Sequence, residues 1–151
     1  MRIGYAQAVI TPKLEPPVYL AGFAHNRITQ SVHDDLYARA LALQDEAGRC
    51  VVLVAVDVIG LFRTDVVDVI GQVQADDESY SGGQPVPAII LSAVHSHHGP
   101  DTMGLWGPDA RKSGVNPEYL HTLKEAITYV ILNAMDTLEP VSGMRTVSVN
   151  G

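Results

Sequence analysis

The chain has 151 residues, enough for one domain with a hydrophobic core, and 46% of them are hydrophobic while 18% are charged. The net charge is −7, which excludes nucleic acid as a partner because neutralising phosphates requires a basic surface. The single cysteine, Cys50, excludes an intrachain disulfide. This composition is typical of a globular protein.

The ends and apolar runs of the sequence give no sign of membrane insertion. The first residues lack the apolar core of a signal peptide, and the longest apolar run, Cys50–Val56, is too short to cross a bilayer. For the sequence as given we therefore expect a cytoplasmic protein with no transmembrane segment. An incomplete amino terminus would leave secretion open.

The first third of the chain predicts three strands and a long loop. Ile3–Ile10 alternates loosely and stops at a proline, and residues 13–30 read as a loop whose polar members are solvated or contact substrate, namely His25, Asn26 and Arg27. Leu36–Leu43 and Cys50–Asp57 flank a polar turn and predict an antiparallel hairpin. Cys50–Asp57 is apolar on both faces, which predicts a strand in the middle of a sheet covered on both sides.

A β-α-β unit is predicted next. Thr64 can cap a helix with an apolar stripe formed by Val66, Val69, Ile70 and Val73. The polar segment Ala75–Pro85 reads as a loop, and Pro87–Val94 reads as a buried strand parallel to Cys50–Asp57.

The last third predicts a surface loop over residues 101–115, a long helix and a final strand. Asn116 and Pro117 form a strong helix start, and apolar residues then recur every three or four positions until Pro140. Gly143–Val149 reads as another strand. Trp106 in the loop either packs against the domain or forms one wall of a pocket.

Three histidines stand where the Pro87–Val94 strand gives way to Gly99-Pro100. His95 and His97 are two residues apart, so an extended backbone places both rings on one side, while His98 faces the other way. Sites in α/β sheets form beyond the carboxyl ends of parallel strands, and paired imidazoles suit zinc or a similar ion. Asp57, at the end of the neighbouring strand, either orients a ligand histidine or caps a turn.

A catalytic zinc ion normally has three protein ligands and a water, so two histidines leave the site incomplete. The remaining candidate ligands are Asp57, His33, Asp34 and Asp35, without a firm spacing argument for any of them. Two other interpretations remain open at this point. One is a different metal-dependent hydrolase, acting on phosphoesters or small amides, and the other is a non-catalytic, truncated or accessory α/β domain.

Four segments, in order, resemble the amino-terminal part of the catalytic domain of the neutral/alkaline, non-lysosomal ceramidases and their bacterial relatives. They cover essentially the whole chain, and the helix start at Asn116 also fits. The histidine segment carries the most specific part of the resemblance, since the family has Ser-Ala-Thr-His-Thr-His-Ser-Gly-Pro there. The segments are Val9–Pro12 with Leu20–Phe23, Val32–Ala40, Val56–Gly60 and Leu91–Pro100.

The resemblance implies a zinc-dependent amide hydrolase that splits the N-acyl bond of ceramide or a related N-acyl lipid, and so a role in sphingolipid metabolism. It implies that His95 is a zinc ligand. It also implies that His97 is catalytic, lying beside the substrate carbonyl and helping to stabilise the oxyanion. Val94, Ser96 and His98 replace the family's usual Thr, Thr and Ser, which predicts altered contacts around the histidines.

Family catalytic domains are much longer than this chain, and their other zinc ligands and active-site serine lie beyond it. We therefore expect residues 1–151 to be a single domain or the amino-terminal portion of a ceramidase-like catalytic domain, inactive or weakly active alone. The expected fold is α/β, a mixed β-sheet with a β-α-β unit and covering helices within a larger layered domain. The expected partners are an N-acyl lipid or other small amide, and either a second copy or the missing carboxy-terminal part.

Overall fold

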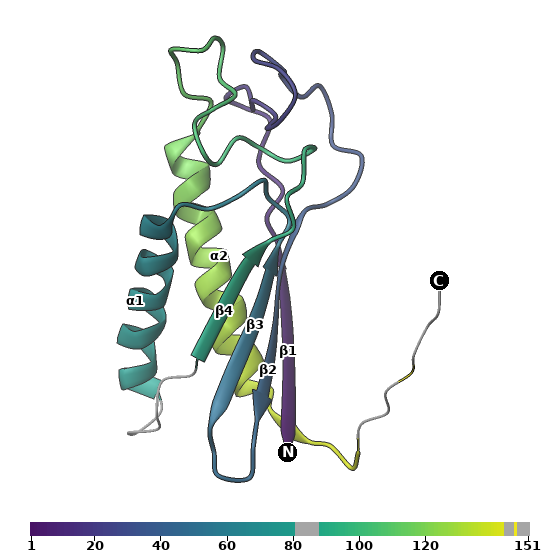
Figure 1. Cartoon of the computed structure of the whole chain (residues 1–151), viewed down its shortest axis with the longest axis vertical. Coiled ribbons are helices and arrows are strands. Elements are labelled where there is room, and N and C mark those ends of the chain that lie inside the picture. Colours follow the sequence, from purple (N-terminus) through teal and green to yellow (C-terminus); the bar gives the residue numbers. More distant parts are fainter. Residues whose placement is uncertain (81–87, 144–146, 148–151) are drawn as a thin grey trace.

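The computed structural model describes residues 1–80, 88–143 and 147, and within them it contains one mixed sheet and two helices (Figure 1). The α/β fold expected from the sequence is therefore confirmed. The elements in chain order are β1 (Arg2–Val9), β2 (Tyr37–Gln44), β3 (Cys50–Val56), α1 (Arg63–Tyr80), β4 (Ala88–Ala93), α2 (Pro117–Asp136) and β5 (Glu139–Pro140).

The described strands form a five-stranded sheet in the order β4-β3-β2-β1-β5. β2 and β3 pair antiparallel, as the predicted hairpin requires, and β3 and β4 pair parallel in the register Val51↔Ala88 to Val56↔Ala93. The β-α-β unit is therefore confirmed. It brings the carboxyl ends of β3 and β4 to the same edge of the sheet, which is where the histidines follow.

Helix α1 is longer than predicted. It begins at Arg63, so that Thr64 lies inside the helix, and it continues to Tyr80 through the segment expected to be a loop. That segment is polar but has neither glycine nor proline before residue 82, so nothing in it breaks a helix. The expected stripe does face the core, with Val69 and Val73 fully buried. Residues 81–85 of the expected loop lie outside the described residues.

Helix α2 begins and packs as predicted. The Asn116 side chain accepts hydrogen bonds from the backbone N–H groups of Glu118 and Tyr119, at 3.0 and 3.2 Å, and so caps the helix. The buried face of α2 lies across β1 and β2 and forms the centre of the core, with Leu123, Ile127, Val130, Ile131 and Ala134. After the helix, β5 pairs with β1, a short strand that the sequence did not predict. The strand expected over Gly143–Val149 lies largely outside the described residues.

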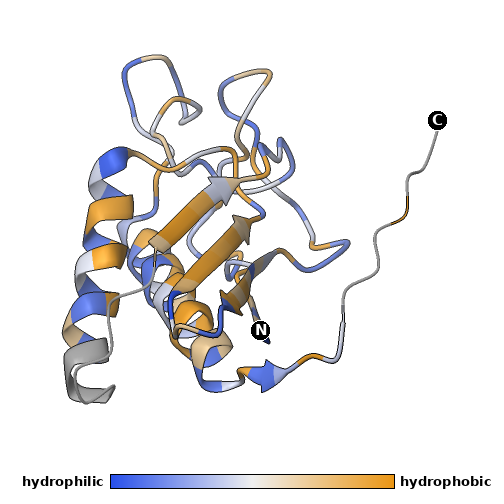
Figure 2. Ribbon diagram, turned by 60° about the horizontal axis from the view of Figure 1, so that its bottom comes forward, coloured by the Kyte–Doolittle hydropathy of each residue, from blue (hydrophilic) through white to orange (hydrophobic). Residues whose placement is uncertain are grey.

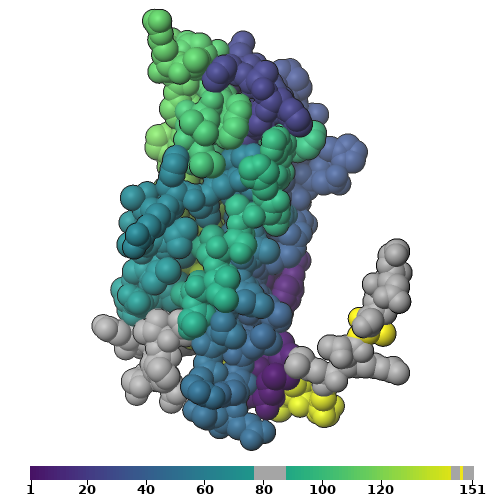
Figure 3. Space-filling view, in the orientation of Figure 1, coloured from purple at the N-terminus to yellow at the C-terminus, as the bar shows by residue number. Residues whose placement is uncertain are grey.

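Within the described part of the chain both helices pack on the same face of the sheet, so the prediction that β3 is covered on both faces is wrong. The other face, here called the open sheet face, carries Tyr5, Leu53 and Ile90, whose exposed fractions are 52%, 39% and 55%. Most of the strand ribbon is orange, and so hydrophobic, in Figure 2, and the strands face the viewer in Figure 3. The apolar residues on both faces of β3 therefore predicted burial on both sides, but the described residues cover only one side.

Replacement of Gly4 by alanine should destabilise the fold, because α2 crosses β1 at this residue. A Cβ atom on Gly4 would overlap the backbone oxygen of Ala134, which cannot move without shifting the helix. We expect a loss of at least about 2 kcal/mol in the free energy of unfolding, measured by urea denaturation. Gly71→Ala is the matched control, since a Cβ there meets nothing within 4 Å, and it should stabilise α1 by up to about 1 kcal/mol. Equal stability of Gly4→Ala and the wild type would contradict this packing.

Candidate active site

The histidine segment runs beside the exit of β3 after β4 has ended. The Val94 N–H donates to Val56 O at 3.0 Å, and the Ser96 N–H donates to Val58 O at 3.1 Å, so the parallel ladder continues past the strand ends. Between these two bonds His95 has a φ of +65°, in the left-handed region. This conformation costs about 1–3 kcal/mol in a non-glycine residue and is concentrated at functional sites.

The rings of His95 and His97 lie together, with centroids 5.0 Å apart. The prediction that they share a side is confirmed, but its reason was wrong, because the backbone at His95 is left-handed rather than extended. His98 lies apart from them, in a pocket that neither of the other two lines. Its predicted opposite orientation stays a prediction.

One nitrogen of His95 is already engaged. Nδ1 lies 2.9 Å from the backbone oxygen of Ile59, and because a carbonyl oxygen only accepts, Nδ1 carries the proton. Nε2 is then the nitrogen with the free lone pair. A ligand histidine oriented by a hydrogen bond from its other nitrogen is the usual arrangement in metal sites, so His95 has the tautomer that a zinc ligand needs.

The His97 ring packs against Phe23 and Gly22. Its Nδ1 is buried without a hydrogen-bond partner among the described residues, and its ring meets the Phe23 ring edge-on at 4.9 Å. Gly22 has a φ of +79°, and a Cβ atom there would overlap the His97 ring. A buried nitrogen without a partner is costly, and such groups gather where a ligand completes the bonding.

Arg27, one of the polar loop residues, bonds the backbone of its own loop. Its Nη1 donates to the backbone oxygens of Ala21 and Gly22, both at 3.0 Å, and so closes the loop that carries Phe23. The Ala21 N–H donates in turn to Gly99 O at 3.0 Å. The solvated role does not describe Arg27, because its guanidinium bonds the backbone of its own loop, and its contact with a substrate stays a prediction.

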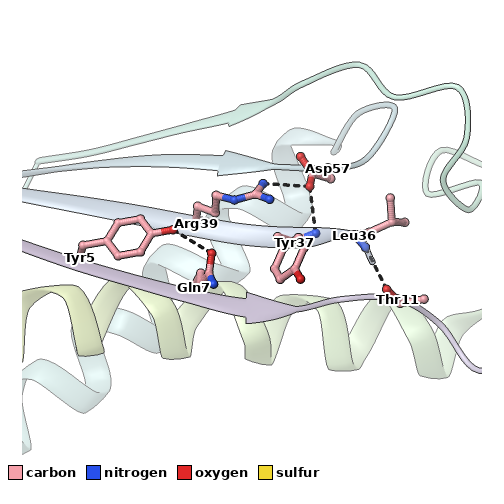
Figure 4. A network of polar contacts seen from close by, with 7 residues as sticks. All are labelled: Tyr5, Gln7, Thr11, Leu36, Tyr37, Arg39 and Asp57. Carbon is pink, nitrogen blue, oxygen red and sulfur yellow. Dashed lines mark hydrogen bonds and ion pairs between the residues drawn. The ribbon is translucent and has the colours of Figure 1, made fainter. Parts of the chain in front are cut away.

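Asp57 does not orient His95, because Nδ1 of His95 is hydrogen-bonded to Ile59 O instead. Its Oδ2 accepts from the Tyr37 N–H at 3.0 Å and from Arg39 Nη1 at 2.9 Å (Figure 4). The carboxylate therefore joins the end of β3 to the start of β2. The turn-capping interpretation of Asp57 is the better one, and its contribution to the site is to fix the end of β3, beside which the histidine segment runs.

The remaining candidate ligands lie in a separate pocket of about 400 Å³ that is also lined by His98. His33 Nδ1 is 2.6 Å from Asp34 Oδ2, and this hydrogen bond raises the pKa of His33. Within the described residues no group of three or more His, Cys, Asp or Glu side chains could hold a metal ion. His95 thus has the geometry expected of one zinc ligand. The other candidates do not complete a metal site with it, namely His33, Asp34, Asp35 and Asp57.

Sequence reasoning missed Asp101, which organises the loop over residues 101–115. The side chain is buried, and its two oxygens accept five backbone N–H groups, those of Met103, Gly104, Leu105, Trp106 and Gly114. The adjacent Thr102 donates to Gly60 O at 2.6 Å, which ties the loop to the exit of β3. An aspartate at the head of a glycine-rich loop was the available signal. Trp106 is partly buried, and its expected role in a pocket stays a prediction.

The loops over residues 13–30 and 101–115 thus meet at the end of the sheet where β3 and β4 finish (Figure 1). The Asn26 N–H donates to Gly107 O at 2.8 Å and joins the two loops directly. The site is therefore built from loops at the end of the sheet where β3 and β4 finish, the usual position for catalysis in an α/β domain.

Among the described residues no helix is long and apolar enough to cross a membrane.

No protein-family model matches the sequence, and no curated protein matches it. A solved structure described as "Ceramidase complexed with C2" is similar over 92% of this chain, with 25% sequence identity and a TM-score of 0.73. The chain spans 22% of that ceramidase chain. The chain therefore has the fold of part of a ceramidase. The predicted resemblance is confirmed to that extent, while the neutral/alkaline class stays a prediction.

Asp101→Ala should destabilise the protein by about 3 kcal/mol or more, because it leaves five N–H groups without their charged acceptor. Asp109→Ala is the matched control in the same loop, since Asp109 is exposed and its side chain accepts one N–H, that of Arg111. Its loss should cost less than about 1 kcal/mol. Thermal and urea unfolding of both variants measure the difference, and equal stabilities would refute the organising role of Asp101.

Proposed function

We propose that this chain is a portion of a ceramidase-like, zinc-dependent amide hydrolase that acts on the N-acyl bond of ceramide or a related N-acyl lipid. The observation that carries this proposal is the structural similarity to a ceramidase over 92% of the chain. The geometry of the histidine segment supports it, since His95 and His97 meet at the carboxyl end of β4, at a strained backbone position.

In this proposal the two histidines have different tasks. His95 binds zinc through Nε2, with Nδ1 held on Ile59 O. Zinc, when bound, supplies the Lewis acidity that polarises an amide carbonyl. His97 lies against His95, and its ring donates a hydrogen bond to the carbonyl oxygen as negative charge develops there. The packing of Gly22 on the His97 ring fixes that donor before the substrate arrives.

The described residues contribute only part of this machinery. They contain no set of three metal ligands, and the chain spans 22% of the similar ceramidase. We propose that the remaining ligands belong to the rest of the catalytic domain. The chain alone then binds zinc weakly through His95 and hydrolyses amides slowly or not at all.

Zinc titration tests this assignment. In nitrogen NMR of the histidine-labelled chain, we expect Zn²⁺ to move the Nε2 resonance of His95 first, because Nδ1 is fixed and Nε2 is free to bind. His95→Ala should remove the strongest binding, whereas His121→Ala, an exposed histidine paired with Glu125 on α2, should leave it unchanged. Binding at His33 or His98, with His95 unmoved, would exclude His95 as the ligand.

Activity assays complete the test. With zinc present, the chain should hydrolyse an N-acyl sphingosine weakly or not at all, and robust turnover would contradict the incomplete site. Faster turnover of a phosphoester than of an amide would instead favour a different metal-dependent hydrolase.

The open sheet face is where we propose that the rest of the domain packs. Leu53 and Ile90 lie on neighbouring strands and expose their side chains there. β4, at the edge of the described sheet, also offers unpaired backbone groups. A second sheet or helical layer from the remainder of a ceramidase-like domain would bury this surface. We take it, rather than a second copy of this chain, as the occupant.

Without that remainder the purified chain should self-associate without a fixed stoichiometry, as seen by sedimentation velocity over a range of concentrations. Ile90→Lys should abolish the association by placing a charge on the open sheet face. Val67→Lys is the matched control, because Val67 is 55% exposed on α1, and it should change nothing. A discrete dimer would indicate a second copy as the occupant, and a monomer at all concentrations would refute a docking role for this face.

A further inference from the structure

Phe23 combines two features that a folded chain normally avoids. Its φ is +61°, a left-handed conformation that is a real outlier for a bulky residue, and its side chain is 79% exposed. The strained backbone raises the free energy of the folded state, and the uncovered ring contributes little burial energy to offset it. Such residues persist where the strain or the exposure serves a binding site.

The exposed ring is nevertheless held in position. One contact is the edge-on packing of the Phe23 and His97 rings at 4.9 Å. The other is the guanidinium of Arg27, which lies 5.2 Å from the ring centroid, within the range of a cation–π interaction. Because Arg27 is itself bonded to Ala21 O and Gly22 O, the ring position is coupled to the backbone of the loop.

The loop is in turn fixed to the histidine segment. The Leu20 N–H donates to Arg27 O at 2.7 Å and closes the base of the loop, and the Ala21 N–H donates to Gly99 O. Phe23 is therefore an exposed apolar surface that lies against the His97 ring and is connected to the histidine segment through its own loop. Its uncovered area lies beside the ring that the proposed function assigns to the amide carbonyl.

From this geometry we propose that Phe23 is a substrate-contacting, specificity-determining residue that receives the apolar chain adjacent to the amide. This proposal rests on the proposed function. An N-acyl lipid carries a hydrocarbon chain directly next to its carbonyl, so a chain packed on Phe23 brings the carbonyl oxygen to His97. Burying the ring against hydrocarbon also removes the apolar surface that the free protein exposes.

The experiment uses binding and needs neither zinc nor turnover. Wild-type chain is titrated with N-hexanoylethanolamine and with N-acetylethanolamine, and the His97 ring resonances are followed by NMR. We expect saturable shifts with the hexanoyl amide and about tenfold weaker binding of the acetyl amide, since the longer chain adds apolar contact. Phe23→Ala should remove the advantage of the longer chain, and Phe23→Leu should restore part of it.

Tyr129→Ala is the matched control, because Tyr129 is an aromatic residue on α2 that is 56% exposed, and it should bind like the wild type. Equal chain-length dependence in wild type and Phe23→Ala would overturn the proposal, as would the absence of any His97 shift in the wild type. Failure of zinc binding at His95 with a retained Phe23 effect would refute the zinc hydrolase but not the apolar subsite. The two proposals therefore fail separately.

Discussion

The site depends on the parallel pairing of β3 and β4 continuing beyond the ends of both strands. Hydrogen bonds from Val94 to Val56 O and from Ser96 to Val58 O leave one residue between them, and that residue is His95. His95 has a left-handed backbone between these two bonds, and its Nδ1 lies 2.9 Å from Ile59 O. Because Ile59 follows β3 and His95 follows β4, this contact depends on the register of the two strands, so any change that shifts β4 along β3 changes the site.

Two loops complete the site, and each is held by one charged side chain that bonds backbone groups. Asp101 gathers five N–H groups of its own loop, and Arg27 closes the other loop through backbone oxygens. Charged hydrogen bonds of this kind exceed neutral ones in strength, and they order segments that have no strand or helix partner. The loops can consequently expose residues such as Phe23 without losing their shape.

Local signals account for what the sequence predicted correctly. Each signal lies within a short stretch of sequence. Examples are the cap at Asn116, the helical stripe of α2 and the apolar run before His95. The role of Asp101 was missed although four of its five N–H partners lie within five residues of it in the sequence. The role of Asp57 was left undecided because its partners, Tyr37 and Arg39, become its neighbours only in the fold. The contact of Gly22 with the His97 ring likewise joins residues far apart in the chain, so composition and period could not reveal it.

The failed prediction for the coverage of β3 is also informative. β3 reads as a strand buried on both faces, yet the described residues cover only the face that contains Val52, Val54 and Val56. A soluble sheet that needs only one covered face alternates apolar and polar residues, and β3 does not. The described residues likewise supply one oriented imidazole but no set of metal ligands. Under the proposed function, a single layer from the rest of a ceramidase-like domain would cover this sheet face and close the site together.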